Sequence, residues 1–205
     1  MFSRIAHELK EHVPFTLFGS VTGVALMIVI VLANVQPRIL QPLFEGSHAL
    51  HVLLSAMVTS AMYRRYRGSI AASVLIGYTG AIATGTLSDV VFPQLGGMLV
   101  GGEMHLHVPF IQEWWLINPI ALAGVALGIW RTTTKVPHSG HILVSTWASL
   151  FYLTAYGEAP WMHVLPQVLA VLFIAVWVPC CFSDIVFPLL FVKSSNAREP
   201  KQAHD

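Results

Sequence analysis

The stretch Ser-Asp-Val-Val-Phe-Pro at residues 88–93 recurs almost letter for letter as Ser-Asp-Ile-Val-Phe-Pro at residues 183–188. Each copy places an aspartate, Asp89 or Asp184, inside or at the end of a strongly apolar run. An ionised carboxylate is costly in such a run unless it is paired, hydrated or functional. The repeated stretch therefore predicts both an internal symmetry of the chain and the place of its chemistry.

The amino-acid composition indicates an integral membrane protein. Of the 205 residues, 55% are hydrophobic and only 10% are charged, which is too apolar for an ordinary soluble domain. The partner expected is the lipid bilayer, and the net charge of +1 gives no indication of nucleic-acid binding. Cys180 and Cys181 are adjacent, which rules out an intrachain disulfide framework. We favour apolar filling for them over a role as two soft metal ligands.

Hydropathy predicts an all-α polytopic membrane protein with six transmembrane helices, at residues 14–35, 48–63, 69–93, 114–130, 138–156 and 162–192. Basic residues gather in the N-terminus, in the loops after the second and fourth spans and in the C-terminus, which would share one side of the membrane. The other side holds only Arg38. The positive-inside rule then places both termini in the cytoplasm. We expect a bacterial plasma (inner) membrane.

Three blocks of sequence occur in the same order in both halves of the chain. His-Val-Pro-Phe at 12–15 recurs at 107–110, the pattern His-x-x-His-x-x-x-Ser at 48–55 recurs at 138–145, and a Ser-Asp block closes each half. Because each half holds three spans, an odd number, the second half is predicted to be inverted, as in many transporters. The expected organisation is a cytoplasmic segment at 1–13, repeat 1 at 14–98, inverted repeat 2 at 99–193 and a disordered cytoplasmic tail at 194–205.

The repeated histidine pairs predict metal binding. Histidines three residues apart lie on one face of a helix, where both imidazoles can reach one small cation. Nitrogen and oxygen ligands of this kind suit zinc, manganese, iron, cobalt or nickel as the divalent metal ion. The predicted metal ligands are His48, His51, Asp89, His138, His141, Asp184, His12 and His107, with Ser55, Ser88, Ser145 and Ser183 in support.

Helix rise predicts two related clusters, one in each leaflet. The outer cluster would combine the pair at 48–51 with Asp89 and with His105 or His107, and the inner one the pair at 138–141 with Asp184 and His12. A register that brings all of them to the midplane is the alternative. Prolines near each Ser-Asp pair also predict that both helices are broken there.

These features favour a transporter of divalent transition-metal cations that works by alternating access of the two repeats, with protons as a counter-ion. Two alternatives stay open. The same histidines could ligate two haems in a membrane electron carrier, or form the histidine boxes of a membrane metalloenzyme. An enzyme is the less favoured interpretation. A chain this short is small for a transporter, so we also expect a homodimer.

Overall fold

The computed structural model describes residues 2–65, 69–131, 135–181 and 187, and for residues 2–9, 11, 12, 135–139 and 181 it describes the backbone alone. The described part of the chain is mostly helical (87%), as the sequence predicts. In chain order the elements are α1 (Phe2–Leu32), α2 (Pro37–Arg65), α3 (Ile70–Thr86), the π-helical turn η1 (Leu87–Val91), α4 (Phe92–Leu99), β1 (Glu103–Met104), α5 (Pro109–Gln112), α6 (Trp114–Trp130), α7 (Lys135–Tyr156), β2 (Gly157–Glu158), the 3-10 turn η2 (Trp161–His163) and α8 (Leu165–Cys181).

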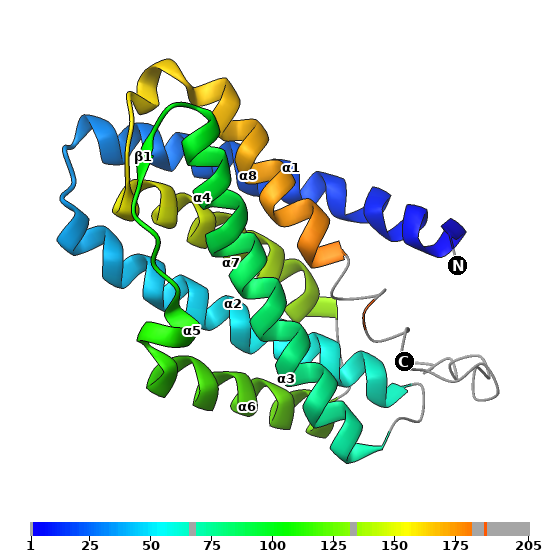
Figure 1. Cartoon of the computed structure of the whole chain (residues 1–205). Coiled ribbons are helices and arrows are strands. Elements are labelled where there is room, and N and C mark those ends of the chain that lie inside the picture. Colours follow the sequence, from blue (N-terminus) through cyan, green and yellow to red (C-terminus); the bar gives the residue numbers. More distant parts are fainter. Residues whose placement is uncertain (1, 66–68, 132–134, 182–186, 188–205) are drawn as a thin grey trace.

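The long helices run back and forth between two ends of the molecule (Figure 1). Each of the apolar runs in the sequence falls on one of these helices. The last run is described as far as residue 181, and of its remaining residues only residue 187 is described. The helix α2 begins at Pro37, well before the expected residue 48. Proline suits this first position because its ring presets a helical φ and the helix needs no N–H there.

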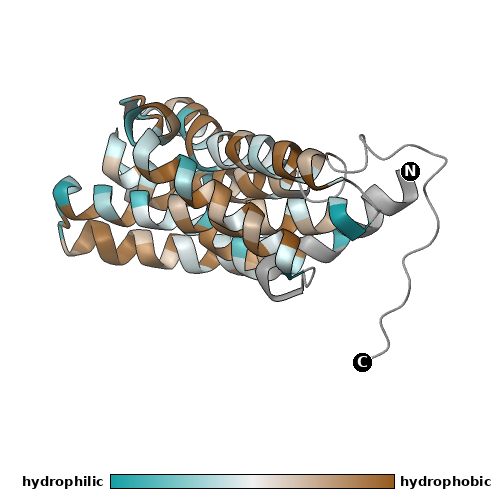
Figure 2. Ribbon diagram, turned by 90° about the horizontal axis from the view of Figure 1, so that it is seen from below, coloured by the Kyte–Doolittle hydropathy of each residue, from teal (hydrophilic) through white to brown (hydrophobic). Residues whose placement is uncertain are grey.

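Among the described residues, two helices are long and apolar enough to cross a membrane, Val13–Leu32 and Ile70–Leu99. The helices Trp114–Trp130 and Leu165–Cys180 are apolar but shorter. Apolar residues are frequent along the length of the bundle (Figure 2), and Leu75 is 64% exposed. These findings support membrane association, whereas the number of spans stays a prediction.

The most extensive contact between helices joins α2 to α7, which carry the two histidine pairs. On its other sides α2 contacts α3 and α6. The contact with α6 is close because Gly124 and Gly128, four residues apart, lie against the backbone carbonyls of Leu53 and Met57. Small residues at this spacing let helices approach closely in membranes. The histidine-bearing helices are thus held in the interior of the bundle.

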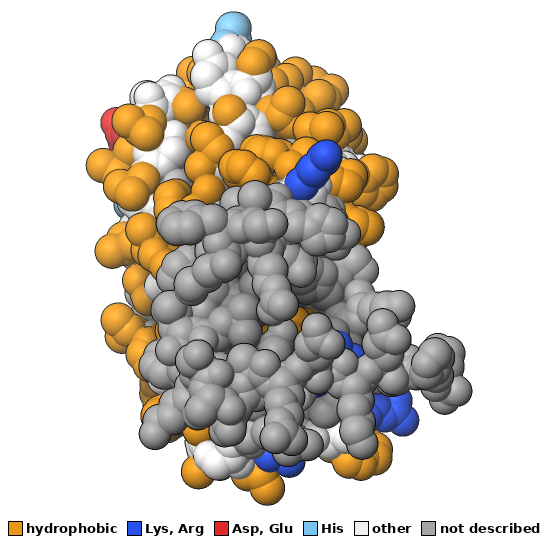
Figure 3. All heavy atoms as spheres, turned by 90° about the vertical axis from the view of Figure 1, so that its right-hand side faces the viewer, with side chains coloured by type: hydrophobic (Ala, Val, Ile, Leu, Met, Phe, Trp, Pro, Cys, Tyr) orange, Lys and Arg blue, Asp and Glu red, His pale blue; other side chains and the backbone are white. Residues whose placement is uncertain are grey.

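The two ends of the molecule differ in charge. At the ribbon end, which comprises residues 33–36, 100–113 and 157–164, β1 pairs antiparallel with β2 and places Glu103 opposite Glu158. At the terminal end, α1 and α7 begin and α2 and α6 finish. Figure 3 looks onto the terminal end and shows lysine and arginine side chains around it. The described ones near these helix ends are Lys10, Arg64, Arg65 and Arg131.

Candidate metal centre

Asp89 is fully buried in η1 and accepts four hydrogen bonds. Its Oδ2 accepts from Nδ1 of His48 at 2.9 Å and from Nδ1 of His51 at 2.7 Å. Its Oδ1 accepts from the hydroxyls of Ser88 at 2.6 Å and Ser145 at 2.7 Å. The expected proximity of the aspartate to its histidine pair is thus observed. Four donors around two oxygens suit an ionised carboxylate, which accepts only.

The helix widens at this aspartate instead of breaking. The backbone stays helical from α3 through η1 into α4, and the N–H of Phe92 donates to the carbonyl of Leu87, five residues earlier. Pro93 has no N–H, so it cannot continue this pattern to the carbonyl of Ser88. The hydroxyl of Ser149 donates to that carbonyl at 2.9 Å. The expected break is therefore wrong for this copy, because a side chain of α7 replaces the missing backbone donor.

The carboxylate fixes the orientation of both imidazole rings. Asp89 can accept from Nδ1 of His48 and His51 only if each Nδ1 carries the proton. In the neutral rings, Nε2 then carries the lone pair and faces away from the carboxylate. An imidazole that binds a metal through one ring nitrogen usually donates the N–H of its other ring nitrogen to a carboxylate or another acceptor. Asp89 is therefore placed to orient ligands, while both of its oxygens are already engaged.

Two further side chains that can bind metal lie beside the ring of His51. Its Nε2 lies 3.9 Å from Sγ of Cys180 on α8, and its ring stacks on that of His141 with centroids 5.8 Å apart and an interplanar angle of 9°. One ligand atom from each of these three side chains falls within 4.8 Å of the others, and all three residues are buried. They come from α2, α7 and α8, so tertiary packing assembles the group.

The separation of His51 and Cys180 fits a small metal ion. Tetrahedral zinc with Zn–N of about 2.1 Å and Zn–S of about 2.3 Å separates the nitrogen and sulfur by roughly 3.6 Å, near the 3.9 Å observed between His51 and Cys180. A thiolate and two imidazoles favour borderline or soft ions such as zinc over manganese, which prefers oxygen. The group could therefore hold a metal ion through His51, His141 and Cys180.

The structure brings His141 to the group around Asp89 and does not place it in a separate inner cluster. The reason is the length of α2: it extends from Pro37 to Arg65, so His51 lies halfway along it and not near one end. Since α7 packs beside α2, the two histidines meet in the interior. For His141 alone, this agrees with the alternative register in which the two clusters meet at the midplane.

The remaining predicted residues of the two repeats lie partly in the described structure and partly outside it. Ser55 is buried, and its Oγ and the Oγ1 of Thr59 have no hydrogen-bond partner in the described part of the chain. In the sequence repeat these two residues correspond to Ser145 and Ser149. For His12 on α1 and His138 on α7, the backbone alone is described, and Ser183 and Asp184 lie outside the described residues.

His107 lies near the ribbon end and not beside Asp89. The ring of Phe44 separates it from the buried group, with its centroid 5.6 Å from His48 and 6.1 Å from His107. The Nε2 of His107 instead lies 3.3 Å from Oε2 of Glu113. His105, the other candidate there, is exposed.

The sequence offered Cys180 as a possible soft ligand, but apolar filling was the favoured interpretation because an apolar run explains a cysteine without any metal. The offset of 95 residues between the Ser-Asp blocks aligns Cys180 with Gly85. A Cβ on Gly85 would lie 3.3 Å from Cε1 of His48. Gly85 thus adjoins His48 and Cys180 adjoins His51, the two histidines that bond to Asp89.

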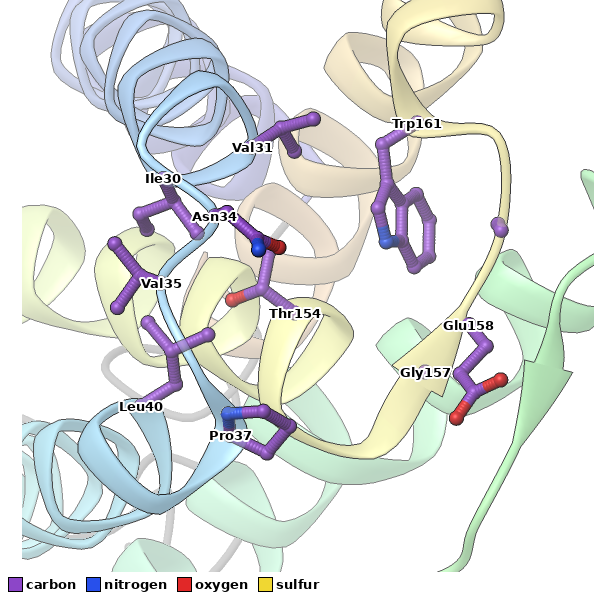
Figure 4. Close-up of a pocket in the computed structure, with 11 residues that line it drawn as sticks. Ile30, Val31, Asn34, Val35, Pro37, Leu40, Thr154, Gly157, Glu158 and Trp161 are labelled. Atoms are coloured by element: carbon purple, nitrogen blue, oxygen red, sulfur yellow. The ribbon is translucent and has the colours of Figure 1, made fainter.

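A pocket of about 290 Å³ at the ribbon end is separate from the buried group. It lies between the α1–α2 turn and the segment after α7, with Asn34, Thr154 and Trp161 around it (Figure 4). Among its described lining residues, Glu158 is the sole carboxylate and there is no histidine or cysteine. The pocket therefore offers too few ligands for a metal ion.

No protein-family model matches this sequence, and no curated protein or solved structure is significantly similar to it. Fold alone would in any case leave the function open. The function must follow from the chemistry of the site, which is a buried histidine and cysteine group whose His51 is hydrogen-bonded to Asp89.

Proposed function

We propose that the protein is an integral membrane transporter of a divalent transition-metal cation, with six spans arranged as two inverted repeats. The observation that carries this proposal is the buried group of His51, His141 and Cys180 behind the carboxylate of Asp89. Ionisable residues inside an apolar bundle mark ion pathways because they are costly there. The ligands also come from both halves of the chain, as expected for a site that opens to either side in turn.

The pattern of helix contacts supports the repeats at 14–98 and 99–193. In an inverted repeat α1, α2 and the α3–α4 segment correspond to α6, α7 and α8. The contact between α2 and α6 then corresponds to the contact between α7 and α1. The contact between α2 and α3 corresponds to that between α7 and α8, and the contact between α1 and α8 corresponds to that between α6 and α3. Each of these contacts is present, which supports the proposed exchange of the two halves.

The hydrogen bonds around Asp89 also join residues of the two proposed repeats. Repeat 1 supplies the aspartate and its histidines, while repeat 2 supplies Ser145. The repeat therefore predicts a counterpart in which Ser55 donates to Asp184, beside the histidine pair at 138–141 and His12. That Ser55 is buried without a partner among the described residues supports this expectation.

Charge supports the orientation. The basic residues of the terminal end belong in the cytoplasm by the positive-inside rule, which gives both termini a cytoplasmic position in the proposed inner membrane. The ribbon end, with Glu103, Glu113 and Glu158, then faces outward. A homodimer remains our expectation for a chain of this size.

Zinc is the ion that the buried group suits best, ahead of cobalt, nickel, iron and manganese. A bound metal requires neutral imidazoles and a thiolate, so binding releases protons. This linkage provides the coupling to protons: protonation of Cys180 and the histidines on the other side of the membrane would release the ion.

Zinc flux into liposomes that contain the purified protein tests the proposal. We expect uptake that is lost in the His51→Ala and His141→Ala variants and retained in His105→Ala, which changes an exposed histidine. Equal flux in the wild type and in both buried variants would refute the proposal. Heat-denaturation curves of each variant would show that loss of flux does not reflect loss of fold.

A membrane metalloenzyme is the second candidate, because His141 joins the group around Asp89 and forms a single site. The two functions differ in what happens to the metal: a transporter exchanges it across the bilayer, whereas an enzyme retains it through turnover. A preparation that holds radioactive zinc without releasing it on the far side would favour the enzyme. A Soret band in the visible spectrum would favour the haem carrier.

A further inference from the structure

A second group of metal-binding side chains lies near the ribbon end, outside the buried group. Glu45 on α2, His107 before α5 and Glu113 between α5 and α6 each offer one ligand atom, and these atoms lie within 4.8 Å of one another. All three residues are partly buried. Two stretches far apart in sequence, α2 and the segment around α5, thus bring two carboxylates and one imidazole to one point.

The polar atoms of this group are poorly satisfied by the described protein. Nε2 of His107 and Oε2 of Glu113 are 3.3 Å apart, yet both are buried atoms without a hydrogen-bond partner in the described part of the chain. Burial and the charge of Glu113 also raise the pKa of Glu45, an effect that His107 partly opposes. A cation between the two carboxylates would relieve their repulsion and give the unsatisfied atoms a partner.

The imidazole of His107 is held in place by its surroundings. Its ring stacks on Tyr156 with centroids 4.5 Å apart and an interplanar angle of 10°. Its backbone N–H donates to the hydroxyl of Tyr152 at 3.2 Å. A ring fixed in this way presents Nε2 in one direction, which lowers the cost of ordering a ligand when a metal binds.

An aromatic layer separates this group from the buried one. The ring of Phe44 lies 5.2 Å from that of Tyr152 and 5.5 Å from that of Tyr156, centroid to centroid, and it stacks on His48 from the ribbon-end side. Along α2, Glu45 precedes His51 by six residues, a rise of about 9 Å. The outer group therefore lies next to the buried site but on the other side of the aromatic layer.

We propose that Glu45, His107 and Glu113 form a second cation site, on the outward side of the layer made by Phe44, Tyr152 and Tyr156. Two carboxylate oxygens and one imidazole nitrogen suit manganese, iron, cobalt or zinc in the divalent state. Calcium fits less well, since it takes six to eight oxygen ligands. The site stands on its own residues, while its role as the place where an ion waits before reaching the buried site rests on the proposed transport function.

Manganese binding to the full-length protein in detergent, followed by electron paramagnetic resonance, tests this site. Manganese is the probe because its preference for oxygen directs it to the outer group and away from the thiolate of Cys180. We expect Glu45→Gln/Glu113→Gln to weaken binding at least tenfold. The matched control Glu103→Gln/Glu158→Gln removes two exposed carboxylates at the same end and should leave the affinity unchanged.

Variants of the buried site separate this proposal from the transport function. The His51→Ala/Cys180→Ser variant should lose zinc at the buried site and keep manganese at the outer one. Unchanged manganese affinity in Glu45→Gln/Glu113→Gln, or equal weakening in the control, would overturn the outer site. Should that double variant fail to fold, His107→Gln alone provides the same comparison, because it removes the fixed nitrogen and keeps both carboxylates.

Discussion

Replacing Asp89 with asparagine tests whether the carboxylate orients the metal-binding histidines or binds the metal itself. Asparagine keeps the size of the side chain and one oxygen that can accept from both imidazoles at the place of Oδ2. Its amide nitrogen would face the hydroxyls of Ser88 and Ser145, which can rotate to accept. The fold should therefore survive the change, while the negative charge behind the histidines is lost.

The magnitude follows from the hydrogen bond to His51. A bond to a charged group contributes about 1.5–3 kcal/mol and a neutral one about 0.5–1.5 kcal/mol, so the ring loses roughly 1–1.5 kcal/mol of positioning energy. That corresponds to about tenfold in affinity, and outer carboxylates of this kind generally change metal affinity by about 10–100-fold. We expect Asp89→Asn to weaken zinc binding within this range.

Competition with a chromophoric chelator measures this affinity in purified protein, with Glu158→Gln as a control that changes an exposed carboxylate. Affinity within about threefold of the wild type would refute the orienting role that its geometry suggests. Complete loss of binding in a folded Asp89→Asn protein would refute it in the other direction, because it would identify the carboxylate as a direct ligand.

Three further changes test other parts of the structure. Cys180→Ser should abolish the sulfur-to-metal charge-transfer absorption of the cobalt-loaded protein and lower the preference for zinc over manganese; an unchanged spectrum would show that the thiol does not bind the metal. Ser149→Ala leaves the Ser88 carbonyl without its donor and should lower the free energy of unfolding by about 1–3 kcal/mol, as measured by chemical denaturation, whereas Ser149→Thr should retain most of it. Gly128→Val forces a side chain against α2 and should lower the free energy of unfolding by roughly 1–3 kcal/mol, as measured by thermal denaturation. The matched change Gly46→Ala is made at a residue with open space around it and should be neutral or stabilising.

The helical fold and the core of the site were predictable from local patterns. A run of apolar residues predicts a helix wherever its length and composition permit, and the spacing of His48 and His51 places both rings on one face. The repeat then indicated that Asp89 belongs with them. These inferences needed only the geometry of a single helix and the comparison of two halves.

The parts that the sequence did not predict depend on contacts between distant segments. Cys180 joins the histidines only because α8 packs beside α7, and Glu45 and Glu113 meet across 68 positions of sequence (113 minus 45). The position of His141 depended on where α2 begins, which hydropathy alone did not define. Pro93 predicts a helix break from sequence alone. The hydroxyl of Ser149 replaces the N–H that Pro93 lacks, and this contact is visible only in three dimensions.

The π-helical turn η1 also has a consequence for the helices on either side of it. A π-helical turn contains one residue more than an α-helical turn, so α4 is rotated by about 100° relative to a direct continuation of α3. The residues of α3 pack against α2 and α6, whereas those of α4 pack against α7 and α8. Deleting one residue between 87 and 91 would therefore shift the phase of the whole following helix and turn Gly96 away from Val171, the side chain it adjoins. One extra residue lets a single continuous helix serve two different sets of neighbours.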